Sequence, residues 1–187
     1  MSRPPTLAAI VADTARIGFV MGSDPTVGAL LRTLAAARPC AAVLELGAGT
    51  GLATAWLLDG LDANSSVTAV ELDSTAGAVL VRHLGHDPRL RVVAEDGDAW
   101  IGANSRRRFD LIFADAMPGK YRRLDETLAM LAPGGLYVVD DMLPQPNWPD
   151  GHGALAQELR TRLEAHDDLA SVSLDVASGV IVAARRQ

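Results

Sequence analysis

Short apolar runs alternate with amphipathic, helix-like segments through the middle of this chain, and this alternation constrains its fold more than any other feature. Continuous apolar runs set between amphipathic helices are typical of parallel strands buried on both faces. The pattern therefore predicts an α/β fold with helices on both faces of a mostly parallel sheet. Predicted strands cover 41–46, 67–72, 90–94, 109–114 and 136–139, and predicted helices cover 52–58, 74–84, a short segment near Trp100 and 121–131.

Further elements flank this alternating region. Before it, a helical apolar pattern ends at Gly18, and Asp24-Pro25 marks a second helix, because aspartate caps a helix and proline fits its first position. After it, a helix carrying Leu159 and Leu163 precedes a hairpin over 172–184. A chain of 187 residues suits one core, so we expect a single domain over 1–187.

A glycine-rich loop follows the first predicted strand. Gly47, Gly49 and Gly51 follow Glu45, with Leu46 between Glu45 and the first glycine. Glycines let the backbone approach a ligand closely and present its amide groups. An NAD-dependent dehydrogenase would need a further glycine three residues after the second one, and that position is Leu52.

Acidic residues end the next two predicted strands. Glu71 ends the second strand, where a carboxylate can accept hydrogen bonds from both hydroxyls of a ribose. Asp98 follows the third strand, where its carboxylate or the Ala99 amide can meet the edge of an adenine. Each residue alone is also typical of a helix cap. Their order at the ends of three strands indicates a site for an adenosine-containing cofactor.

With these motifs the chain resembles the class I S-adenosylmethionine-dependent methyltransferases, in segments 43–51, 97–99 and 131–135 and at Glu71. The resemblance implies a single Rossmann-like domain with a seven-stranded sheet in the order 3-2-1-4-5-7-6 and strand 7 antiparallel. It implies that the helices of 1–38 cover the cofactor site and that 39–187 form the S-adenosylmethionine-binding core. The residues it assigns to the cofactor are Met21, Ser23, Glu45, Gly47, Ala48, Gly49, Gly51, Glu71, Leu72, Asp98, Ala99 and Asp115.

Three aspartates follow the fourth and fifth predicted strands. Asp115 ends the fourth, and Asp140 and Asp141 end the fifth. Neighbouring parallel strands bring them to one rim, where like charges raise each other's pKa unless a positive charge lies between them. A hard divalent cation such as Mg²⁺ prefers these oxygen ligands. The alternative is that Asp140 caps a turn, Asp141 faces solvent and Asp115 holds the cofactor's amino group without a metal.

The aspartates narrow the resemblance to the catechol and caffeoyl-coenzyme A type of O-methyltransferase. This resemblance implies that Asp115, Asp140 and Asp141 bind Mg²⁺ or another divalent cation, with aspartate at 141 where the family has asparagine. The family often places a lysine base three residues after the first metal ligand, where this chain has Pro118. Lys120 is then the candidate base, and Asp115 is the next candidate if no metal is bound.

The implied reaction is transfer of a methyl group from S-adenosylmethionine to a hydroxyl of a small-molecule acceptor, catechol-like or other. A formal net charge of −6 argues against a nucleic-acid partner, although some relatives in this family modify tRNA. The alternatives are a tRNA-modifying methyltransferase of the same fold, a metal-independent small-molecule methyltransferase, and a module that binds the cofactor without catalysis.

Other features bear on location and on the acceptor pocket. One cysteine, no signal-peptide pattern and no long apolar stretch predict a cytoplasmic protein without membrane association. Short segments near the acceptor site leave two alternatives, an open pocket or one completed by a second copy in a homodimer. Trp148 either walls this pocket or packs its own loop, and His152, like the other histidines, is interpreted as a surface or helix-end residue.

Overall fold

The computed structural model describes residues 2–146 and 148–187. A seven-stranded sheet runs through it in the order β3-β2-β1-β4-β5-β7-β6. β7 is antiparallel to its two neighbours and all other pairs are parallel. The predicted fold and strand order are therefore confirmed. The strands are β1 (Ala42–Leu46), β2 (Ser66–Glu71), β3 (Leu90–Ala94), β4 (Phe109–Ala114), β5 (Leu131–Val139), β6 (Leu169–Leu174) and β7 (Val180–Arg185).

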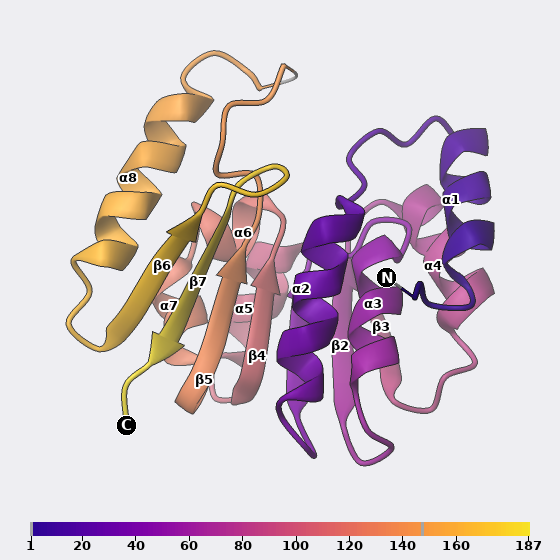
Figure 1. Cartoon of the computed structure of the whole chain (residues 1–187), viewed down its shortest axis with the longest axis horizontal. Helices are drawn as coiled ribbons and strands as arrows, with labels where there is room; N and C mark the ends of the chain where they lie inside the picture. Colours follow the sequence, from indigo (N-terminus) through magenta and orange to yellow (C-terminus); the bar gives the residue numbers. More distant parts are fainter. Residues whose placement is uncertain (1, 147) are drawn as a thin grey trace.

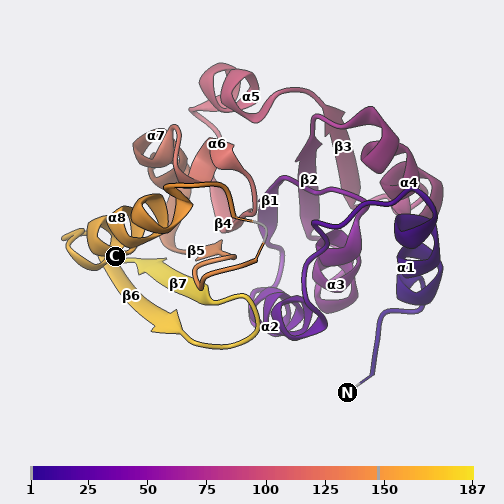
Figure 2. The same cartoon turned by 90° about the horizontal axis from the view of Figure 1, so that it is seen from above.

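Helices cover both faces of the sheet (Figure 1, Figure 2). Successive residues of a strand divide between the two cores, so that Val43 packs with the first set of helices and Leu44 with the second. This two-sided burial is what the continuous apolar runs predicted. The first set is α1 (Leu7–Arg16), α2 (Pro25–Ala36), α3 (Leu52–Gly60) and α4 (Ser74–Leu84), and the second is α5 (Gly97–Asn104), α7 (Leu124–Ala129) and α8 (His152–Glu164).

Aspartate caps fix where several helices begin. Asp24 accepts a hydrogen bond from the amide of Thr26 at the start of α2. Asp73 caps α4 and Asp96 caps α5 in the same way. Each cap satisfies amide groups that have no partner within the helix. The predicted bounds 74–84, 90–94 and 109–114 agree with the structure.

The predicted helix over 121–131 and strand over 136–139 are wrong in their bounds. Helix α7 covers only Leu124–Ala129, and β5 begins at Leu131. Leu131 is already paired with Phe109 of β4, and the pairing then shifts register before Leu136. Gly134, with φ of +70°, lies inside this irregular stretch. The glycines therefore bend a strand here and do not end a helix.

Several connections gather at one end of the molecule. The segment 17–24 between α1 and α2, the loop after β5 and the turn between β6 and β7 all lie at the end to which β4 and β5 point (Figure 1). α1 and α2 themselves pack against α4 and α3. The segment between these helices, together with Pro25 at the start of α2, therefore reaches the carboxyl ends of the strands.

Candidate functional site

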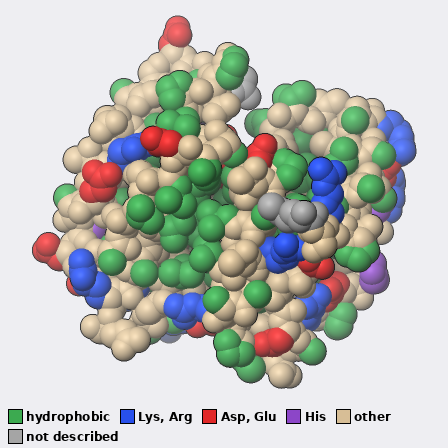
Figure 3. Space-filling model, in the orientation of Figure 1, with side chains coloured by type: hydrophobic (Ala, Val, Ile, Leu, Met, Phe, Trp, Pro, Cys, Tyr) green, Lys and Arg blue, Asp and Glu red, His purple; other side chains and the backbone are tan. Residues whose placement is uncertain are grey.

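Two adjoining cavities open at the carboxyl ends of the central strands. The smaller one, of about 330 Å³, lies at the ends of β1 and β2. The larger one, of about 760 Å³, lies beside the ends of β4 and β5. Asp115, Met21, Ala116 and Met117 line both cavities. The space-filling view shows a notch at this end of the molecule (Figure 3). A group bound in one cavity therefore lies next to a group bound in the other.

The glycine loop forms one wall of the smaller cavity. Gly47 and Gly49 have φ of +86° and +53°, a region that other residues rarely adopt. A Cβ at residue 47 would lie 2.6 Å from the Asp115 carbonyl oxygen, so β1 and β4 approach this closely only with glycine there. Glu71, the last residue of β2, holds this loop by a hydrogen bond. Its Oε2 accepts from the Gly49 amide at 2.6 Å, and its Oε1 accepts from the Asp73 amide at 2.7 Å.

Apolar side chains form much of the remaining lining of the smaller cavity. Met21 is 69% exposed and Leu72 is 67% exposed, and both line it. Large apolar side chains left open at a cavity are a typical contact surface for a flat ring. Glu71 adds a carboxylate, which accepts hydrogen bonds from hydroxyl groups. The cavity thus suits a ligand that carries both an apolar ring and hydroxyls.

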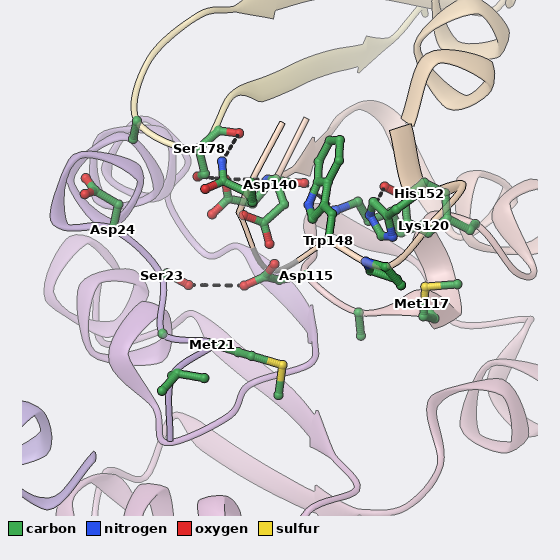
Figure 4. Close-up of a pocket in the computed structure, with 18 of the residues that line it drawn as sticks. Met21, Ser23, Asp24, Asp115, Met117, Lys120, Asp140, Trp148, His152 and Ser178 are labelled. Carbon is green, nitrogen blue, oxygen red and sulfur yellow. Dashed lines mark hydrogen bonds between the residues drawn. The ribbon is translucent and has the colours of Figure 1, made fainter. Parts of the chain in front are cut away.

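The three aspartates meet in the larger cavity, as the strand order predicted. Figure 4 shows Asp115 between Ser23 and Asp140. The Ser23 hydroxyl donates to Asp115 Oδ2 at 3.2 Å, which ties the segment after α1 to the end of β4. Asp140 Oδ1 accepts from the Asp141 amide at 2.7 Å and from the Ser178 hydroxyl.

A tight turn brings Lys120 to the same cavity. In α6 (Met117–Lys120), Pro118 has ψ of 136° and Gly119 has φ of +82°, which are the angles of a type II turn. The Tyr137 hydroxyl donates to the Gly119 carbonyl at 2.7 Å and holds this turn. Lys120 is only 4% exposed, and its Nζ donates to the Asp140 carbonyl oxygen at 2.5 Å. The buried amine therefore lies beside the aspartates.

Known proteins share this arrangement of strands and loops. A methyltransferase domain family matches residues 44–142, which is more than half of the chain. The chain belongs to this methyltransferase domain family. A curated protein of Mycolicibacterium vanbaalenii, named "Putative O-methyltransferase", is 27% identical to this methyltransferase over 172 residues, which cover 87% of it and 76% of the relative.

Two further similarities bear on the alternatives. A tRNA1(Val) (adenine(37)-N6)-methyltransferase of Citrobacter koseri is 32% identical over 103 residues, which cover 54% of this methyltransferase and 40% of that protein. The crystal structure of an O-methyltransferase from Bacillus cereus in complex with SAH has a TM-score of 0.84 at 21% identity, and the match covers 100% of this chain and 93% of that one. The predicted family is confirmed, and the dehydrogenase alternative falls.

Burial and charge repulsion set the protonation of the larger cavity in this methyltransferase. Burial, followed by the charges of Asp140 and Asp141, raises the pKa of Asp115 well above its usual range. Burial also raises the pKa of Asp140. Burial lowers the pKa of Lys120, and the three carboxylates oppose this effect. The cavity therefore favours states in which a proton or a cation lies among the carboxylates.

Most residues that the resemblance assigned to the cofactor line a cavity. Asp98 and Ala99 are exceptions among the described residues: Asp98 pairs with Arg122 at 2.7 Å, and the Ala99 amide donates to Asp96. The structure places Asp96 and Gly97 on the lining instead. Glu45 and Gly51 are also exceptions, since they line none of these spaces. Ser23 lines the larger cavity, and Ala48 lines a narrow recess beside the two cavities. The other assigned residues line the smaller cavity, and they are Met21, Gly47, Gly49, Glu71, Leu72 and Asp115.

Glu45 is turned into the core. It is completely buried, and its Oε2 accepts from the Thr54 hydroxyl of α3 at 2.6 Å. Its Oε1 has no hydrogen-bond partner among the described residues. Burial raises the pKa of Glu45 to about 8, the charge of Glu71 adds to the effect, and the Thr54 hydrogen bond opposes it. The Glu45 carboxyl is therefore protonated over much of the range in which exposed glutamates are ionised.

The rings of Tyr121, Trp148 and His152 form a wall of the larger cavity that sequence reasoning largely missed. Figure 4 labels Trp148 and His152. The Tyr121 hydroxyl lies 3.1 Å from His152 Nε2, and the Trp148 and His152 rings are 4.6 Å apart. Trp148 thus lines the pocket, and its ring packs against His152 at the start of α8. His152 is a helix-end residue, as interpreted, since it begins α8, and its half-buried side chain also lines the cavity. Its place directly after the loop from β5 was the available signal.

No helix in the described part of the chain combines the length and the apolar character that crossing a membrane requires. The cytoplasmic location and the homodimer stay predictions.

Proposed function

We propose that this methyltransferase transfers a methyl group from S-adenosylmethionine to a hydroxyl of a small-molecule acceptor. The observation that carries the proposal is the meeting of the two cavities at Asp115. One cavity offers surfaces for an adenosine-containing cofactor, and the other has room for a separate molecule. The relatives named as O-methyltransferases support oxygen as the methylated atom.

The smaller cavity fits S-adenosylmethionine. Its glycine loop is a cradle that a Cβ at residue 47 would fill, and Glu71 stands where ribose hydroxyls need an acceptor. Leu72 and Met21 offer apolar contacts to a flat ring. When bound, S-adenosylmethionine supplies a methyl group on a positively charged sulfur. The chain's own part is to align that methyl with the acceptor, which contributes several kcal/mol to rate enhancement.

Asp115 is the group that takes the proton from the acceptor hydroxyl. It lines both cavities, and its raised pKa makes it a stronger base than an exposed aspartate. The acceptor oxygen forms its new bond to the methyl carbon, the pair of electrons of the carbon–sulfur bond stays on sulfur, and the hydroxyl proton passes to the Asp115 carboxylate. Lys120 holds the acceptor oxygen by an N–H hydrogen bond, and the Ser23 hydroxyl keeps Asp115 in place.

The residues that the resemblance implied as metal ligands do not fit a divalent cation in this arrangement. Asp140 Oδ1 already accepts two hydrogen bonds. Among the described residues, no three acidic, histidine or cysteine side chains are grouped to hold a metal. No step of the proposed reaction therefore passes through a metal.

Methylation of RNA has less support. The tRNA-modifying relative shares only 40% of its length with this chain, and the net charge of −6 opposes binding to a polyanion.

Turnover with a panel of phenols and alcohols tests the proposal. S-adenosylhomocysteine formed from S-adenosylmethionine is measured for the wild type, Asp115→Asn and the exposed control Asp175→Asn. We expect at least one acceptor to be methylated, with turnover reduced roughly 100-fold or more in Asp115→Asn, as for loss of a general base, and unchanged in the control. Calorimetry with S-adenosylhomocysteine checks that both variants still bind it. Wild-type turnover by Asp115→Asn would refute the assigned role, and a wild type that does not bind S-adenosylhomocysteine would refute the function.

A further inference from the structure

One arginine reaches the smaller cavity from the segment that also contributes to the larger one. Arg122 lies just beyond α6 and lines the smaller cavity, whereas Lys120, two residues earlier, lines the larger cavity. Of the described residues on the lining of the smaller cavity, Arg122 alone is basic. The sequence motifs for the cofactor did not indicate it, because it follows the fourth strand and lies outside the glycine loop.

An ion pair holds the Arg122 side chain at this cavity. Its Nε lies 2.7 Å from Asp98 Oδ2. The other oxygen of this carboxylate, Oδ1, is buried and has no hydrogen-bond partner among the described residues. The carboxylate that the resemblance assigned to the adenine is therefore paired with a guanidinium, and it is the guanidinium that lines the cavity.

The backbone around Arg122 is also held in place. Its amide donates to the Met117 carbonyl at 3.0 Å, and its carbonyl accepts from the Gly119 amide at 2.7 Å. A Cβ at residue 97 would lie 2.8 Å from the Pro118 side chain, so this turn packs directly on the start of α5. The position of the guanidinium thus depends on main-chain contacts as well as on its ion pair.

The order of the strands indicates which part of the cofactor lies beside Arg122. The reactive methyl group has to lie where the two cavities meet, which is at Asp115 after β4. Glu71, at the end of β2, is the acceptor for the ribose hydroxyls. The adenine then extends toward the end of β3, where Asp96 and Gly97 line the cavity. Arg122 is paired with the residue that follows Gly97.

We propose that the Arg122 guanidinium binds the adenosine half of the cofactor. The proposal rests on the proposed function, because it takes S-adenosylmethionine as the ligand of the smaller cavity. The ion pair uses Nε, so the terminal nitrogens of the guanidinium keep N–H donors. These donors suit the ring nitrogens of adenine, which accept hydrogen bonds, and the planar group suits the edge of a flat ring.

Binding measurements test this contact and need no methyl acceptor. Calorimetry gives the affinity for S-adenosylhomocysteine, and its displacement gives the affinity for 5′-methylthioadenosine, which has the adenosine half without the amino-acid half. We expect Arg122→Met to weaken both ligands by the same factor, roughly tenfold, as for loss of a hydrogen bond from a charged group. Arg123→Met is the matched control and should bind both ligands as the wild type does. Arg123 pairs with Glu126 and is not part of the described lining of either cavity.

Asp98→Asn distinguishes a contact with the cofactor from a tether between α5 and the turn. It breaks the ion pair but leaves the guanidinium, so we expect a smaller loss of affinity than in Arg122→Met. Equal losses in the two variants would overturn the proposal, because the ion pair alone would then explain them.

Two results with Arg122→Met also overturn the proposal. One is unchanged affinity for both ligands, and the other is a loss for S-adenosylhomocysteine without a loss for 5′-methylthioadenosine. If Arg122→Met does not fold, Arg122→Lys takes its place, since an ammonium keeps the charge but not the planar set of donors. A several-fold loss in Arg122→Lys supports the contact, and wild-type affinity overturns it.

The wild type separates this inference from the proposed function. If it binds S-adenosylhomocysteine and Arg122→Met binds equally well, the proposed function stands and this inference alone fails. If the wild type binds neither ligand, the proposed function is refuted and the inference falls with it.

Discussion

Glu45 makes the stability of this methyltransferase depend on pH in a way that one substitution can isolate. Its pKa is raised by burial from 4.5 to about 8, so the folded chain holds a proton that the unfolded chain releases. The stabilising effect of this neutral carboxyl is complete below pH 4.5 and is lost as pH rises through about 8. At ~1.4 kcal/mol per pKa unit, the loss over this window is on the order of 3 to 5 kcal/mol.

Glu45→Gln removes this ionisation while keeping the size and shape of the neutral acid. Any mismatch between the amide and the pocket shifts the free energy of unfolding equally at every pH. The quantity to compare is therefore the slope of the unfolding free energy plotted against pH. We expect the difference in unfolding free energy between Glu45→Gln and wild type, measured by urea denaturation from pH 5 to 8.5, to grow in favour of the variant by on the order of 3 to 5 kcal/mol.

Glu158→Gln on the exposed face of α8 is the matched control, and its difference from wild type should stay constant with pH. Parallel curves for Glu45→Gln and wild type would refute the reasoning, because they would mean that the buried carboxyl ionises as readily in the folded chain as in the unfolded one.

Two further substitutions test packing and the cofactor cavity. In Gly28→Ala the new Cβ would lie 2.2 Å from the Trp56 ring, so we expect the unfolding free energy to fall by about 1–3 kcal/mol. Gly77 lies within α4, and a Cβ there would have its nearest atom at 3.8 Å, so Gly77→Ala should raise the unfolding free energy by about 0.5–1 kcal/mol. Destabilisation of both to the same extent contradicts the packing argument. Leu72→Ser should weaken S-adenosylhomocysteine binding roughly tenfold in calorimetry, because it removes about 1–2 kcal/mol of apolar contact, while Val81→Ser, at an exposed position on α4, should not. Unchanged affinity in Leu72→Ser would mean that the flat ring of the cofactor does not contact Leu72.

The sequence was sufficient for the sheet because its strands are buried on both faces. Val43 and Leu44 pack on opposite sides of the sheet, so the strand has no polar face and reads as a continuous apolar run. The α4 bounds were equally accessible, since a short polar sequence precedes an amphipathic helix there. Once strand order was set, the meeting of Asp115 with Asp140 and Asp141 followed from neighbouring parallel strands.

Features that depend on side-chain direction were less accessible. Glu45 ends a strand beside the glycine loop, yet its side chain points to Thr54 in the core and away from the smaller cavity. His152 reaches the larger cavity only because the loop after β5 returns over the site. A strand position or a helix start fixes where a residue lies along the chain, but which way its side chain points depends on the packing of elements distant in sequence.

Lys120 shows how one turn changes the interpretation of a motif. Counting residues from Asp115 places the family's lysine at position 118, where this chain has proline. The count therefore suggests that the lysine is missing from this site. In a regular helix, residues 118 and 120 would point about 200° apart, and Lys120 would face away from the site. Pro118 and Gly119 instead form a type II turn, and Lys120 is buried beside Asp140. Proline followed by glycine is the usual sequence of that turn, so the same two residues that remove the lysine from its usual position also bring Lys120 to the aspartates.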